Sequence, residues 1–536
     1  MSWNYSEAID RIGQGPLADR PALIHENTAI SFAQLRQRAR GIAAWLQQLP
    51  LQRHSHIGHY MRNSNAYLET FFGSSLIGCA HVNVNYRYQN RELEELCNTL
   101  DIEVLVYDAE FADRVAAIKP QLEKTIAFIE VTTTVPINDF ATAIHELYDY
   151  PTADLQKNTA GDNQILIATG GTTGLPKGTQ WLQQDLWQKM NVCSNFGMLP
   201  VKETPQTFDD YIGIIEGLPA SPALFPMSPL MHGTGLMMAI SLLAQGSPVV
   251  TTGKAKYDPD HCLDLMAANK VGMIVIVGDA FALPLLAAIE SRNDNCFASV
   301  AVVMSSGAIL SDESRARFKA QRDAMVLLDT LGSSEASGFA MTTEQAGIFM
   351  PMPTTIVLDE NMQKVEPGSD VIGMVYAGGY SPIGYYNEPE KSAETFVVVD
   401  DKRYVKTGDR CLLRADGMLE LLGRDSSVIN TGGEKVFTIE VEQELLRYEA
   451  IADALVVGLP HPRFGKMVVA VVEGPGVTND NIEVEAIQTY LRQSLADYKV
   501  PIKIYAIESL QRFANGKVDY AFVTDYAASC LAQKEE

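Results

Sequence analysis

The sequence predicts an α/β fold with a large N-terminal domain and a small α+β C-terminal domain. Short, continuously apolar runs such as VGMIVIVG (271–278) and SVAVVM (299–304) alternate with helical stretches such as DESRARFKAQR (312–322). Runs of this kind are typical of strands buried on both faces, and therefore of largely parallel sheets covered by helices. A further observation is the change of texture near residue 424, where an apolar strand passes into a polar connection with glycines.

The N-terminal region opens with a predicted hairpin and helix. Two short apolar stretches flank Glu26 and Asn27, which predicts two antiparallel strands. Apolar residues then recur at helical spacing from Leu35 to Leu46, which predicts a helix. Further along the chain, ALPLLAAIE (282–290) predicts another helix, and AMVLLD (324–329) predicts a strand.

The chain beyond the polar connection predicts a separate domain, since about 110 residues are enough for an independent α+β unit. We therefore predict an N-terminal domain at 1–423, a hinge at 424–428 and a C-terminal domain at 429–536. The elements expected in the last domain are a helix at EVEQELLRY (440–448), strands at DALVVGL (453–459) and MVVAVVEG (467–474), and a helix at EAIQTYLRQSLADY (485–498).

Composition excludes several classes of protein. The 536 residues have a formal net charge of -24, which opposes binding to nucleic acid or to anionic lipid. Seven cysteines are scattered without a Cys-x-x-Cys pair, so neither disulfides nor a zinc site is expected. No apolar run reaches the length of a membrane span, and the first residues lack the layout of a signal peptide. These features predict a cytoplasmic enzyme.

The stretch ATGGTTGLPKGTQW (168–181) is the first candidate site. Its glycines would let backbone amides approach an anion closely, and its lysine would supply the countercharge. The Walker pattern is not met, because Pro176 precedes Lys177 and Gly178 follows it, and this excludes a P-loop kinase. Taken alone, the stretch also fits a surface turn between two strands.

The stretch DTLGSSEASG (329–338) ends a predicted strand and presents Asp329, Ser334 and Glu335 at its carboxyl edge. In open α/β sheets, ligands bind at that edge. Glu335 offers the hard oxygen ligands that magnesium prefers. Taken alone, this acid also fits a solvated turn.

Three further motifs each place one reactive side chain beside glycine. YVKTGDR places Asp409 where its carboxylate could accept both hydroxyls of a ribose, PLMHGTGL places His232 before an apolar helix, and FANGKVDYAF presents Lys517 near the end of the chain. In isolation, Asp409 also fits an ordinary turn acid, His232 a structural histidine and Lys517 a solvated lysine.

The order of these motifs is more specific than any one of them. A Gly/Thr loop ending in Pro-Lys-Gly is followed by the histidine turn, the Gly-x-Ser-Glu strand end, the Thr-Gly-Asp turn, a Gly-Arg hinge and a terminal Gly-Lys. From about Pro21 to Val518, the chain resembles the adenylate-forming superfamily of acyl-CoA synthetases, firefly luciferase and peptide-synthetase adenylation domains. The resemblance implies α/β subdomains with a small barrel-like β subdomain, followed by a small mobile C-terminal domain.

Enzymes of this family join a carboxylic acid to ATP, release pyrophosphate, and pass the acyl group from AMP to a thiol. The resemblance implies that the glycine loop wraps the β- and γ-phosphates of ATP. Relatives usually have Ser where this chain has Gly170, so one hydroxyl donor is missing. The implied phosphate-binding residues are Thr169, Gly170, Gly171, Thr172, Thr173, Gly174 and Lys177.

The resemblance also assigns the nucleoside contacts. Leu331 stands where relatives commonly have an aromatic residue stacked on adenine, so apolar contact replaces stacking. Ser334 replaces a common threonine and keeps its hydroxyl. The other implied contacts are Gly307, Ala308 and Asp329 for adenine, Asp409 for ribose, Arg424 for ribose or phosphate, and Glu335 for Mg²⁺.

The implied catalytic residues are Lys517, Glu335 and His232. Lys517 matches the lysine that bridges the attacking carboxylate and the α-phosphate, where an ammonium group between two anions lowers the barrier. His232 matches a gate between the ATP and acyl sites. The C-terminal domain would rotate between the two steps at the hinge, where Ser426 replaces the usual Asp or Lys. Gly432 and Gly433 would then line the pantetheine channel.

The expected function is an ATP-dependent acyl-CoA synthetase that uses ATP, Mg²⁺ and CoA. An apolar wall with Met237, Met238 and Phe281 points to a hydrophobic acid, and the motifs look most like those of bacterial synthetases for fatty or bulky cyclic and steroid-type acids. Delivery to a carrier protein, β-lactone closure, and a degenerate nucleotide- or acyl-binding protein remain alternatives. Retention of Lys517, Glu335 and Asp409 disfavours a mere binder. A homodimer is left open.

Overall fold

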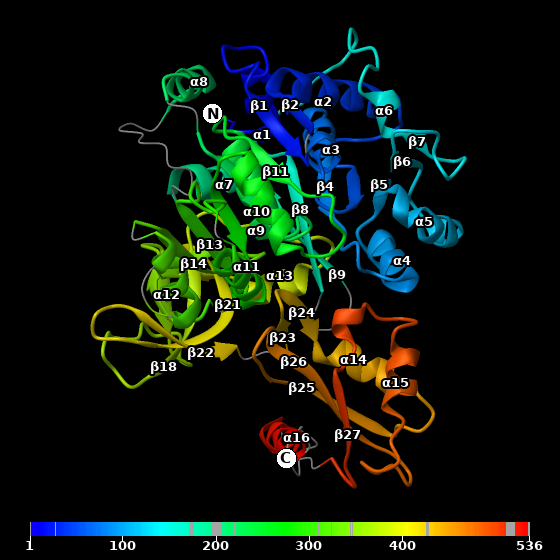
Figure 1. Ribbon diagram of the computed structural model, residues 1–536, viewed down its shortest axis with the longest axis vertical. Coiled ribbons are helices and arrows are strands. Elements are labelled where there is room, and N and C mark those ends of the chain that lie inside the picture. The colour runs from blue at the N-terminus through cyan, green and yellow to red at the C-terminus, as the bar shows by residue number, and fades with distance from the viewer. Residues whose placement is uncertain are drawn as a thin grey trace.

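The structure is a computed structural model that describes residues 2–26, 28–170, 176–193, 205–218, 221–292, 294–308, 310–322, 324–342, 345, 347–424, 428–510 and 520–533. Figure 1 shows a large body, blue through yellow, above a smaller body in orange and red. The smaller body contains the chain from β23 onward. The predicted fold class, an α/β protein with a large N-terminal and a small C-terminal domain, is confirmed.

The largest sheet combines parallel and antiparallel strands. Its central strands β10, β12, β13 and β14 pair in parallel, whereas β14 to β18 and β20 to β22 pair with antiparallel neighbours. Within the described residues the order is β17 (Thr355–Leu358), β18 (Ile372–Gly378), β21 (Lys402–Leu413), β22 (Leu419–Arg424), β16 (Ile348–Pro351), β15 (Ser337–Thr342), β14 (Val326–Ser333), β13 (Val302–Ser306), β12 (Val271–Ile276), β10 (Ala223–Pro226), β11 (Val249–Thr251), β1 (Pro21–His25) and β2 (Thr28–Ser31), with β20 (Phe396–Val399) beside β21.

The second sheet is parallel at its centre and contains a hairpin near one end. The hairpin pairs β8 with β9 in antiparallel register, with Gly170 opposite Pro176 and Thr169 opposite Lys177. The order is β19 (Gly384–Tyr385), β9 (Pro176–Leu182), β8 (Gln164–Gly170), β4 (Ala80–Asn83), β3 (His56–Tyr60), β5 (Ile102–Asp108), β6 (Ala127–Val131) and β7 (Thr142–Ala143).

The third sheet is made only of strands from the C-terminal body. Its order is β24 (Glu434–Phe437), β23 (Val428–Thr431), β26 (Gly465–Glu473) and β25 (Asp453–His461), with β27 (Lys503–Ala506) parallel to β26. Helices α14 (Thr438–Leu445) and α15 (Val484–Leu491) share one hydrophobic cluster with this sheet, and α16 (Tyr520–Gln533) shares another.

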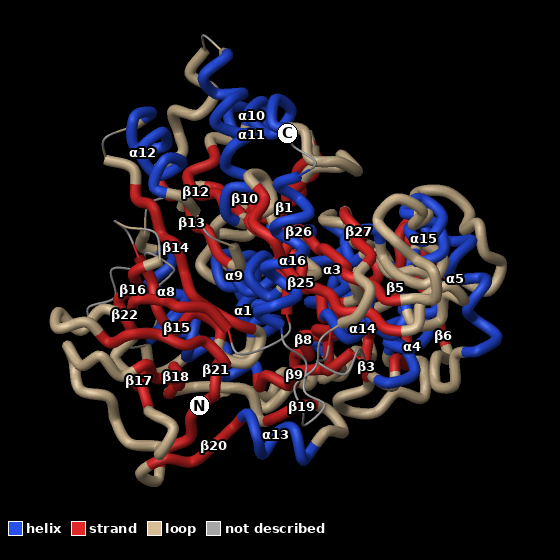
Figure 2. Tube along the Cα trace, turned by 90° about the horizontal axis from the view of Figure 1, so that it is seen from below, coloured by secondary structure: helices blue, strands red, loops and turns tan. Residues whose placement is uncertain are grey.

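Helices cover the sheets of the large body. In the view from below, several of them lie around the outside of the strands (Figure 2). They are α1 (Tyr5–Ile12), α2 (Phe32–Leu46), α3 (Asn65–Leu76), α4 (Asn90–Thr99), α5 (Ala112–Ile118), α6 (Ile144–Leu147), α7 (Gln183–Trp187), α8 (Phe208–Glu216), α9 (Gly233–Leu243), α10 (Pro259–Ala268), α11 (Gly278–Ser291), α12 (Asp312–Gln321) and α13 (Pro389–Thr395). Short 3₁₀ or π turns are η1 (Ala109–Phe111), η2 (Lys119–Gln121), η3 (Gln188–Cys193) and η4 (Asp497–Lys499).

The continuously apolar runs form strands buried on both faces, as predicted. Along β12, Met273 and Val275 belong to one hydrophobic cluster, while Ile274 and Ile276 belong to another on the opposite face. Successive side chains of a strand point to opposite faces, so a strand covered on both sides needs apolar residues at every position. The predicted N-terminal hairpin and helix are also confirmed as β1, β2 and α2.

One predicted helix is shorter than expected. The stretch 485–498 was predicted to be one helix, but α15 ends at Leu491, and a separate 3₁₀ turn, η4, follows at Asp497–Lys499. Pro501 disfavours helical geometry at Val500 and so explains why no helix continues beyond η4, but it does not explain the end of α15 at Leu491. The break leaves Tyr498 and Lys499 in a tight turn instead of on a helix face.

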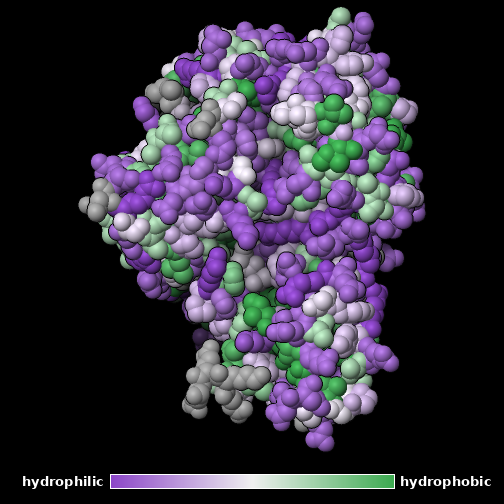
Figure 3. All heavy atoms as spheres, turned by 45° about the vertical axis from the view of Figure 1, so that its right-hand side comes forward, coloured by the Kyte–Doolittle hydropathy of each residue, from purple (hydrophilic) through white to green (hydrophobic). Residues whose placement is uncertain are grey.

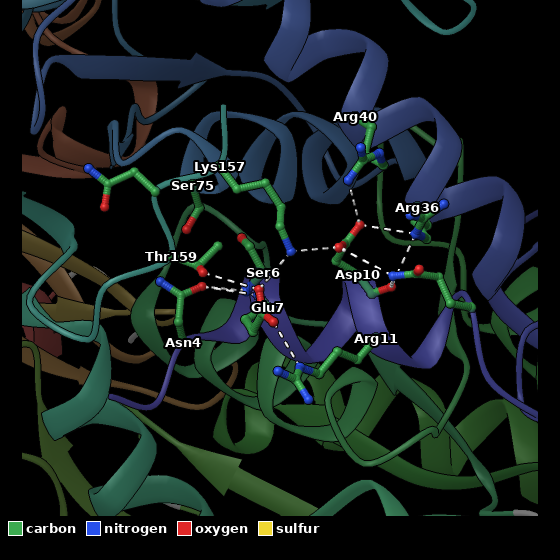
Figure 4. Close-up of polar contacts among 12 residues, drawn as sticks. Asn4, Ser6, Glu7, Asp10, Arg11, Arg36, Arg40, Ser75, Lys157 and Thr159 are labelled. Atoms are coloured by element: carbon green, nitrogen blue, oxygen red, sulfur yellow. Dashed lines mark hydrogen bonds and ion pairs between the residues drawn. The ribbon is translucent and has the colours of Figure 1, made fainter. Parts of the chain in front are cut away.

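Helix α1 is held to its neighbours by a charge network (Figure 4). The buried carboxylate of Asp10 pairs with Arg36 at 3.0 Å, Arg40 at 3.2 Å and Lys157 at 2.9 Å. Lys157 also pairs with Glu7 at 3.0 Å. Burial alone would raise the pKa of Asp10, but the surrounding cations outweigh it and hold this pKa below its ordinary value.

The surface of the protein is mostly hydrophilic on the face drawn in Figure 3. This agrees with the formal net charge of -24. Among the described residues, no helix is both long enough and apolar enough to cross a membrane.

Candidate active site

A cavity of about 160 Å³ lies where the large body meets the C-terminal body. Thr169, His232, Gly307 and Ser334 line it from the large body, and Gly433 lines it from the C-terminal body. Five residues from five separate motifs are therefore brought together. Three of them, Thr169, Gly307 and Ser334, lie at or directly after the carboxyl ends of strands, where ligands bind in open α/β sheets.

Strand ends position the residues of the large body. Thr169 lies near the end of β8, Gly307 directly follows β13, and Ser334 directly follows β14. Gly307 has φ +89°, a backbone conformation that favours glycine. Asn83, at the end of β4, donates to the Ala168 carbonyl at 3.2 Å and accepts from the Ala168 amide at 2.6 Å, which ties β4 to β8.

The turn after β14 is fixed by two side-chain hydrogen bonds. The indole of Trp181 donates to the Ser334 carbonyl at 2.8 Å, and the hydroxyl of Tyr385 donates to Glu335 Oε1 at 2.7 Å. The ammonium group of Lys177 lies 5.3 Å from the centre of the Tyr385 ring. Tyr385 therefore joins the predicted magnesium ligand and the predicted phosphate-binding lysine.

Burial sets the protonation states in this cluster. It lowers the pKa of Lys177, and the charge of Lys391 lowers it further, although Glu335 raises it. Burial raises the pKa of the Tyr385 hydroxyl far above its ordinary value, and the Glu335 charge raises it too. Tyr385 consequently remains protonated and can only donate to the Glu335 carboxylate.

His232 lies at the start of α9 and faces the C-terminal body. Its Nε2 lies 3.2 Å from Oε1 of Glu434. Burial lowers the pKa of His232 to about 3, with further lowering by Arg87 and Lys435. The imidazole is therefore neutral near pH 7, so its contact with Glu434 is a hydrogen bond donated by the ring and not an ion pair.

At Gly433 the backbone of the C-terminal body lies close to the large body. Its φ is +90°, and a Cβ atom added there would lie 2.4 Å from Val277 Cγ1 of the large body. The neighbouring Gly432 has φ +56° and would place a Cβ atom 3.2 Å from the Phe464 ring. The turn at 432–433 thus requires glycine both for its backbone conformation and for the space that it occupies.

Other predicted residues of the described chain do not line this cavity. The buried Asp329 carboxylate pairs with Arg315 at 3.0 Å, and burial raises the pKa of Asp329 to about 6 although Arg315 lowers it. Asp409 is buried on β21, where its backbone pairs with that of Arg424 on β22. Among the predicted residues whose burial is described, the others outside the lining are Lys177, Ala308, Glu335 and Gly432.

The apolar side of the cavity is rich in methionine. Met237 and Met238 of α9, which were expected in an acyl-binding wall, line it, whereas Phe281 does not. The ring of Phe281 packs instead against Tyr257, with 4.9 Å between ring centres. The apolar lining includes Ile167, Met190, Met231, Met237, Met238 and Met304.

Several predicted site residues lie outside the described residues. They are Gly171, Thr172, Thr173 and Gly174 of the glycine loop, Lys517, and Ser426 of the hinge. The flanking strands β8 and β9 pair with each other, and Thr169 of β8 lines the cavity.

Comparison with known proteins identifies the family. A family model described as AMP-binding enzyme matches residues 11–386, and a second, described as AMP-binding enzyme C-terminal domain, matches residues 440–517. The chain belongs to the AMP-binding enzyme family. The adenylate-forming resemblance seen in the motifs is therefore confirmed.

Relatives of this AMP-binding enzyme are named as CoA ligases. A medium/long-chain-fatty-acid–CoA/3-oxocholest-4-en-26-oate–CoA ligase of Mycobacterium marinum is 32% identical over 95% of this chain and 94% of its own length. A 3-oxocholest-4-en-26-oate–CoA ligase of Rhodococcus rhodochrous is 32% identical over 95% of this chain and 93% of its own length. The predicted enzyme class, an AMP-forming acid–CoA ligase, is confirmed.

The fold is shared with solved structures of lower identity. The amide bond synthetase McbA of Marinactinospora thermotolerans matches with a TM-score of 0.79 and 20% identity, over 98% of this chain and 99% of that chain. At this identity the likeness shows a common fold, with a large domain followed by a small one.

Sequence reasoning missed several residues that shape the site of this AMP-binding enzyme. Glu434 directly follows the predicted glycines 432 and 433, and Tyr385 follows Gly384 in GYYNEPEK, so each could have been flagged as a polar group beside glycine. Asn83 and Lys499 give no such signal. They lie in NVNYR and DYKVP, which by pattern alone fit a loop and a solvated helix end.

Proposed function

We propose that this enzyme activates a hydrophobic carboxylic acid with ATP and transfers the acyl group to CoA. In the first step a carboxylate oxygen attacks the α-phosphorus, and the bond from that phosphorus to the pyrophosphate oxygen breaks. In the second step the CoA thiolate sulfur attacks the acyl carbon, and the bond from that carbon to the AMP oxygen breaks. The observation that supports this proposal is one cavity with a polar side of strand-end turns and a methionine wall.

The methionine wall supports a hydrophobic acid that is fatty or bulky and cyclic. Five methionines line the cavity, and methionine side chains are unbranched and flexible enough to adapt to ligands of different outline. The Mycobacterium marinum relative is named both for medium/long-chain fatty acids and for a cholestenoic acid. A deformable wall is the physical property that an enzyme handling chain and ring substrates would need.

The roles in the first step follow from the resemblance and from the geometry of the described neighbours. Lys517 would lie between the carboxylate and the α-phosphate, where its charge offsets the repulsion of two anions. Lys177 and the glycine loop would bind the β- and γ-phosphates. Gly307 would face adenine, with Asp329 behind it, while Asp409 and Arg424 would face the ribose.

A magnesium ion fits Glu335. Magnesium commonly uses one or two carboxylates together with substrate phosphates, and the hydrogen bond from Tyr385 to Oε1 fixes the orientation of the Glu335 carboxylate. Among the described residues, no group of three His, Cys, Asp or Glu side chains is placed to hold a metal ion. A magnesium ion at Glu335 would therefore take its other ligands from the phosphates of ATP. It would neutralise charge on the phosphates during adenylation.

The roles in the second step rest on the meeting of the two bodies. Gly432 and Gly433 would form the wall of a channel for the pantetheine arm of CoA. Neutral His232 would lie between the nucleotide and acyl sites, where it can shift without the cost of moving a charge. The hinge at 424–428 would permit the change of orientation between the steps.

The cellular compartment and the oligomeric state belong to the same proposal. Six of the seven cysteines have described side chains; these six are free thiols, and five of them are buried, which supports a reducing compartment such as the cytoplasm. A homodimer stays a prediction.

The test is pyrophosphate release with ATP and Mg²⁺ over a panel of short, long, aromatic and steroid-like acids, each with and without CoA. We expect release to require a hydrophobic acid and CoA to convert the adenylate into a thioester. Thioester formed only on a carrier protein, or a β-lactone formed without any thiol, would replace CoA transfer by that alternative. Binding of ATP without release for any acid would favour a nucleotide- or acyl-binding protein.

A further inference from the structure

A buried lysine joins the C-terminal body to the large body. Nζ of Lys499, in the turn η4, lies 2.6 Å from Oε1 of Glu92 on α4 and 2.7 Å from Oε1 of Glu440 on α14. Lys499 is only 4% exposed and Glu92 only 5%. Glu440 belongs to the same body as the lysine, whereas Glu92 belongs to the other. We call these three residues the Lys499 cluster.

The cluster is part of a longer strip of polar contacts. Residues 85–92 of the large body, between β4 and the first turn of α4, face the C-terminal body. Arg91 pairs with Glu444 at 2.6 Å, Asn85 donates to the Tyr498 hydroxyl at 3.2 Å, and Arg87 pairs with Glu434. Within this strip, Lys499 is the buried cation that pairs with two carboxylates.

Because Lys499 is charged and buried, the Lys499 cluster is stable only when the two domains are oriented so that Glu92 lies beside the lysine. Burial would lower the pKa of Lys499, but the surrounding rings and carboxylates hold it well above its ordinary value, so the lysine stays charged. Its ammonium group also lies 4.9 Å from the centre of the Tyr88 ring. A buried charge that loses one of its partners is strongly destabilised, so this burial suits only the orientation in which Glu92 is present.

The orientation that satisfies Lys499 is the one that presents the glycine turn to the cavity. Tyr498, Lys499, Gly433 and Glu434 all line the cavity from the C-terminal side. In the same orientation Gly433 touches Val277, and Glu434 accepts from His232. Helix α16, which begins at Tyr520, lies at the opposite end of the C-terminal body (Figure 1).

We propose that Lys499 is a positioning residue which, through its ion pair with Glu92, holds the C-terminal domain in the orientation used for thioester formation. This inference rests on the two-step reaction proposed above. It assigns Lys499 no part in adenylation, which needs the other orientation. The energy of the ion pair is gained only when the domains dock with the 432–433 turn at the cavity, so its loss should slow the second step selectively.

Glu92→Gln is the sharpest variant, because Glu92 contacts the C-terminal domain without belonging to it. Glu92 also completes the capping box of α4 by accepting from the Gln89 amide at 3.0 Å, and glutamine can fill this position equally well. The matched control is Glu94→Gln on the same helix. In the described part of the chain, no hydrogen bond or ion pair joins Glu94 to the C-terminal domain.

The two half-reactions are measured separately with the best acid of the panel. Pyrophosphate release is followed in a single turnover without CoA, and thioester formation is followed from supplied acyl-AMP with CoA. For Glu92→Gln we expect thioester formation to fall about tenfold or more, because a buried ion pair is broken, while pyrophosphate release changes less than about twofold. Glu94→Gln should match the wild type in both steps. Equal loss in both steps, or unchanged thioester formation, would overturn the proposal.

A double-mutant cycle tests whether Glu92 acts through Lys499. If it does, Glu92→Gln combined with Lys499→Gln should slow thioester formation little more than Lys499→Gln alone, and additive losses would contradict the assignment. If thermal unfolding shows that Lys499→Gln does not fold, the comparison of Glu92→Gln with Glu94→Gln in the two half-reactions still tests the proposal.

Hydrogen exchange gives a readout that does not depend on turnover. In Glu92→Gln, the amides of residues 85–92 and 432–437 should exchange faster than in the wild type and in Glu94→Gln. Unchanged exchange would contradict docking by this pair. A wild type that exchanges as expected but adenylates no acid would leave the docking role intact and would refute the proposed function.

Discussion

Tyr385 shows how a residue outside every predicted motif can govern two residues inside them. Its hydroxyl donates to Glu335 at 2.7 Å, and the ammonium group of Lys177 lies 5.3 Å from the centre of its ring. Glu335 is the proposed magnesium ligand, and Lys177 is a proposed phosphate contact. Tyr385 therefore contacts both side chains that are proposed to act at the ATP phosphates, the carboxylate of Glu335 and the ammonium group of Lys177.

Tyr385→Phe should weaken the use of MgATP while leaving the acyl site unchanged. The variant keeps the ring near Lys177 but removes the hydrogen bond to a carboxylate, a kind of bond that contributes about 1.5–3 kcal/mol. We expect kcat/KM for MgATP to fall about tenfold and the Mg²⁺ concentration needed for half-maximal ATP binding to rise. Calorimetric titration of ATP at several Mg²⁺ concentrations gives the second quantity without turnover.

The neighbouring tyrosine supplies a matched control. The hydroxyl of Tyr386 donates to Asp101 at 2.8 Å, also a tyrosine–carboxylate bond, but neither residue lines the cavity. Tyr386→Phe should leave both ATP binding and its magnesium dependence unchanged. Equal effects of the two substitutions would mean that Tyr385 acts on stability alone.

Lys517→Ala should separate the two half-reactions in the opposite sense to Glu92→Gln. Without a cation between the carboxylate and the α-phosphate, pyrophosphate release should fall by two to three orders of magnitude, roughly 3–4 kcal/mol. Thioester formation from supplied acyl-AMP should continue. Full retention of pyrophosphate release in this variant would show that the assigned role is wrong.

At the scale of single residues, the sequence predicts the polar residues of the site better than it predicts the contacts that hold them in place. Thr169, His232, Gly307, Ser334 and Gly433 each lie in a short turn rich in glycine or hydroxyl residues, a local signal that survives without a structure. Partnerships such as Tyr385 with Glu335 depend on how distant segments meet, and no local pattern encodes that meeting.

At the scale of elements, α1 is attached to its neighbours by buried ion pairs. The carboxylate of Asp10 in this helix forms ion pairs with two arginines of α2 and with Lys157, so one buried carboxylate connects three segments of the chain (Figure 4). A carboxylate that is surrounded by cations in the folded state and free in the unfolded state links stability to pH.

Asp10→Asn should lower the free energy of unfolding by about 2 kcal/mol near pH 7, because three cations lose their common partner and are only partly screened by solvent. The folded-state pKa of Asp10 lies below its ordinary value of 3.8, so its contribution is fully present above pH 3.8 and is lost as the pH falls through the folded-state pKa. Urea unfolding of both proteins from pH 7 down to pH 3 should show the difference shrinking only at the acid end.

An exposed carboxylate gives the comparison for this measurement. Asp209 also pairs with an arginine, Arg11, but its side chain is 88% exposed. Asp209→Asn should change the free energy of unfolding by less than about 0.5 kcal/mol at every pH. A difference for Asp10→Asn that persisted unchanged below the folded-state pKa would mean that packing, not charge, holds α1.

The elements also show where sequence patterns stop being informative. The apolar runs of β12 and β13 predict buried strands because burial on both faces requires apolar residues at every position. The helical spacing of 485–498 is genuine up to Leu491. Beyond it, the local pattern does not reveal that η4 must turn Lys499 toward an acid of the other domain.

At the scale of the whole molecule, the cavity is lined by residues of two domains. The large domain supplies the methionine wall and the strand-end turns, and the C-terminal domain closes the cavity with the 432–433 turn and η4. The motifs predict that both domains contribute residues to the reaction. They do not predict the orientation, since the packing of Gly433 against Val277 is a property of two surfaces and not of either sequence segment.

Gly433→Ala should block this meeting of the domains. An alanine Cβ atom would lie 2.4 Å from Val277 Cγ1, and the residue would also be held at φ +90°, which L-residues rarely adopt. We expect thioester formation from supplied acyl-AMP to fall at least 100-fold, roughly 3 kcal/mol or more, while pyrophosphate release from acid and ATP falls far less.

Two further variants separate collision from backbone strain. Gly476 lies in the same domain at φ +72°, but a Cβ atom there would meet nothing within 4 Å, so Gly476→Ala adds strain without a collision and should leave thioester formation nearly unchanged. Val277→Ala removes the atom that the added Cβ atom of Gly433→Ala would strike. If collision between domains is the cause, Gly433→Ala combined with Val277→Ala should regain much of the lost rate relative to Val277→Ala alone. If the combined variant stays as slow as Gly433→Ala, the turn requires glycine for its backbone, and closure of the cavity does not depend on the contact with Val277.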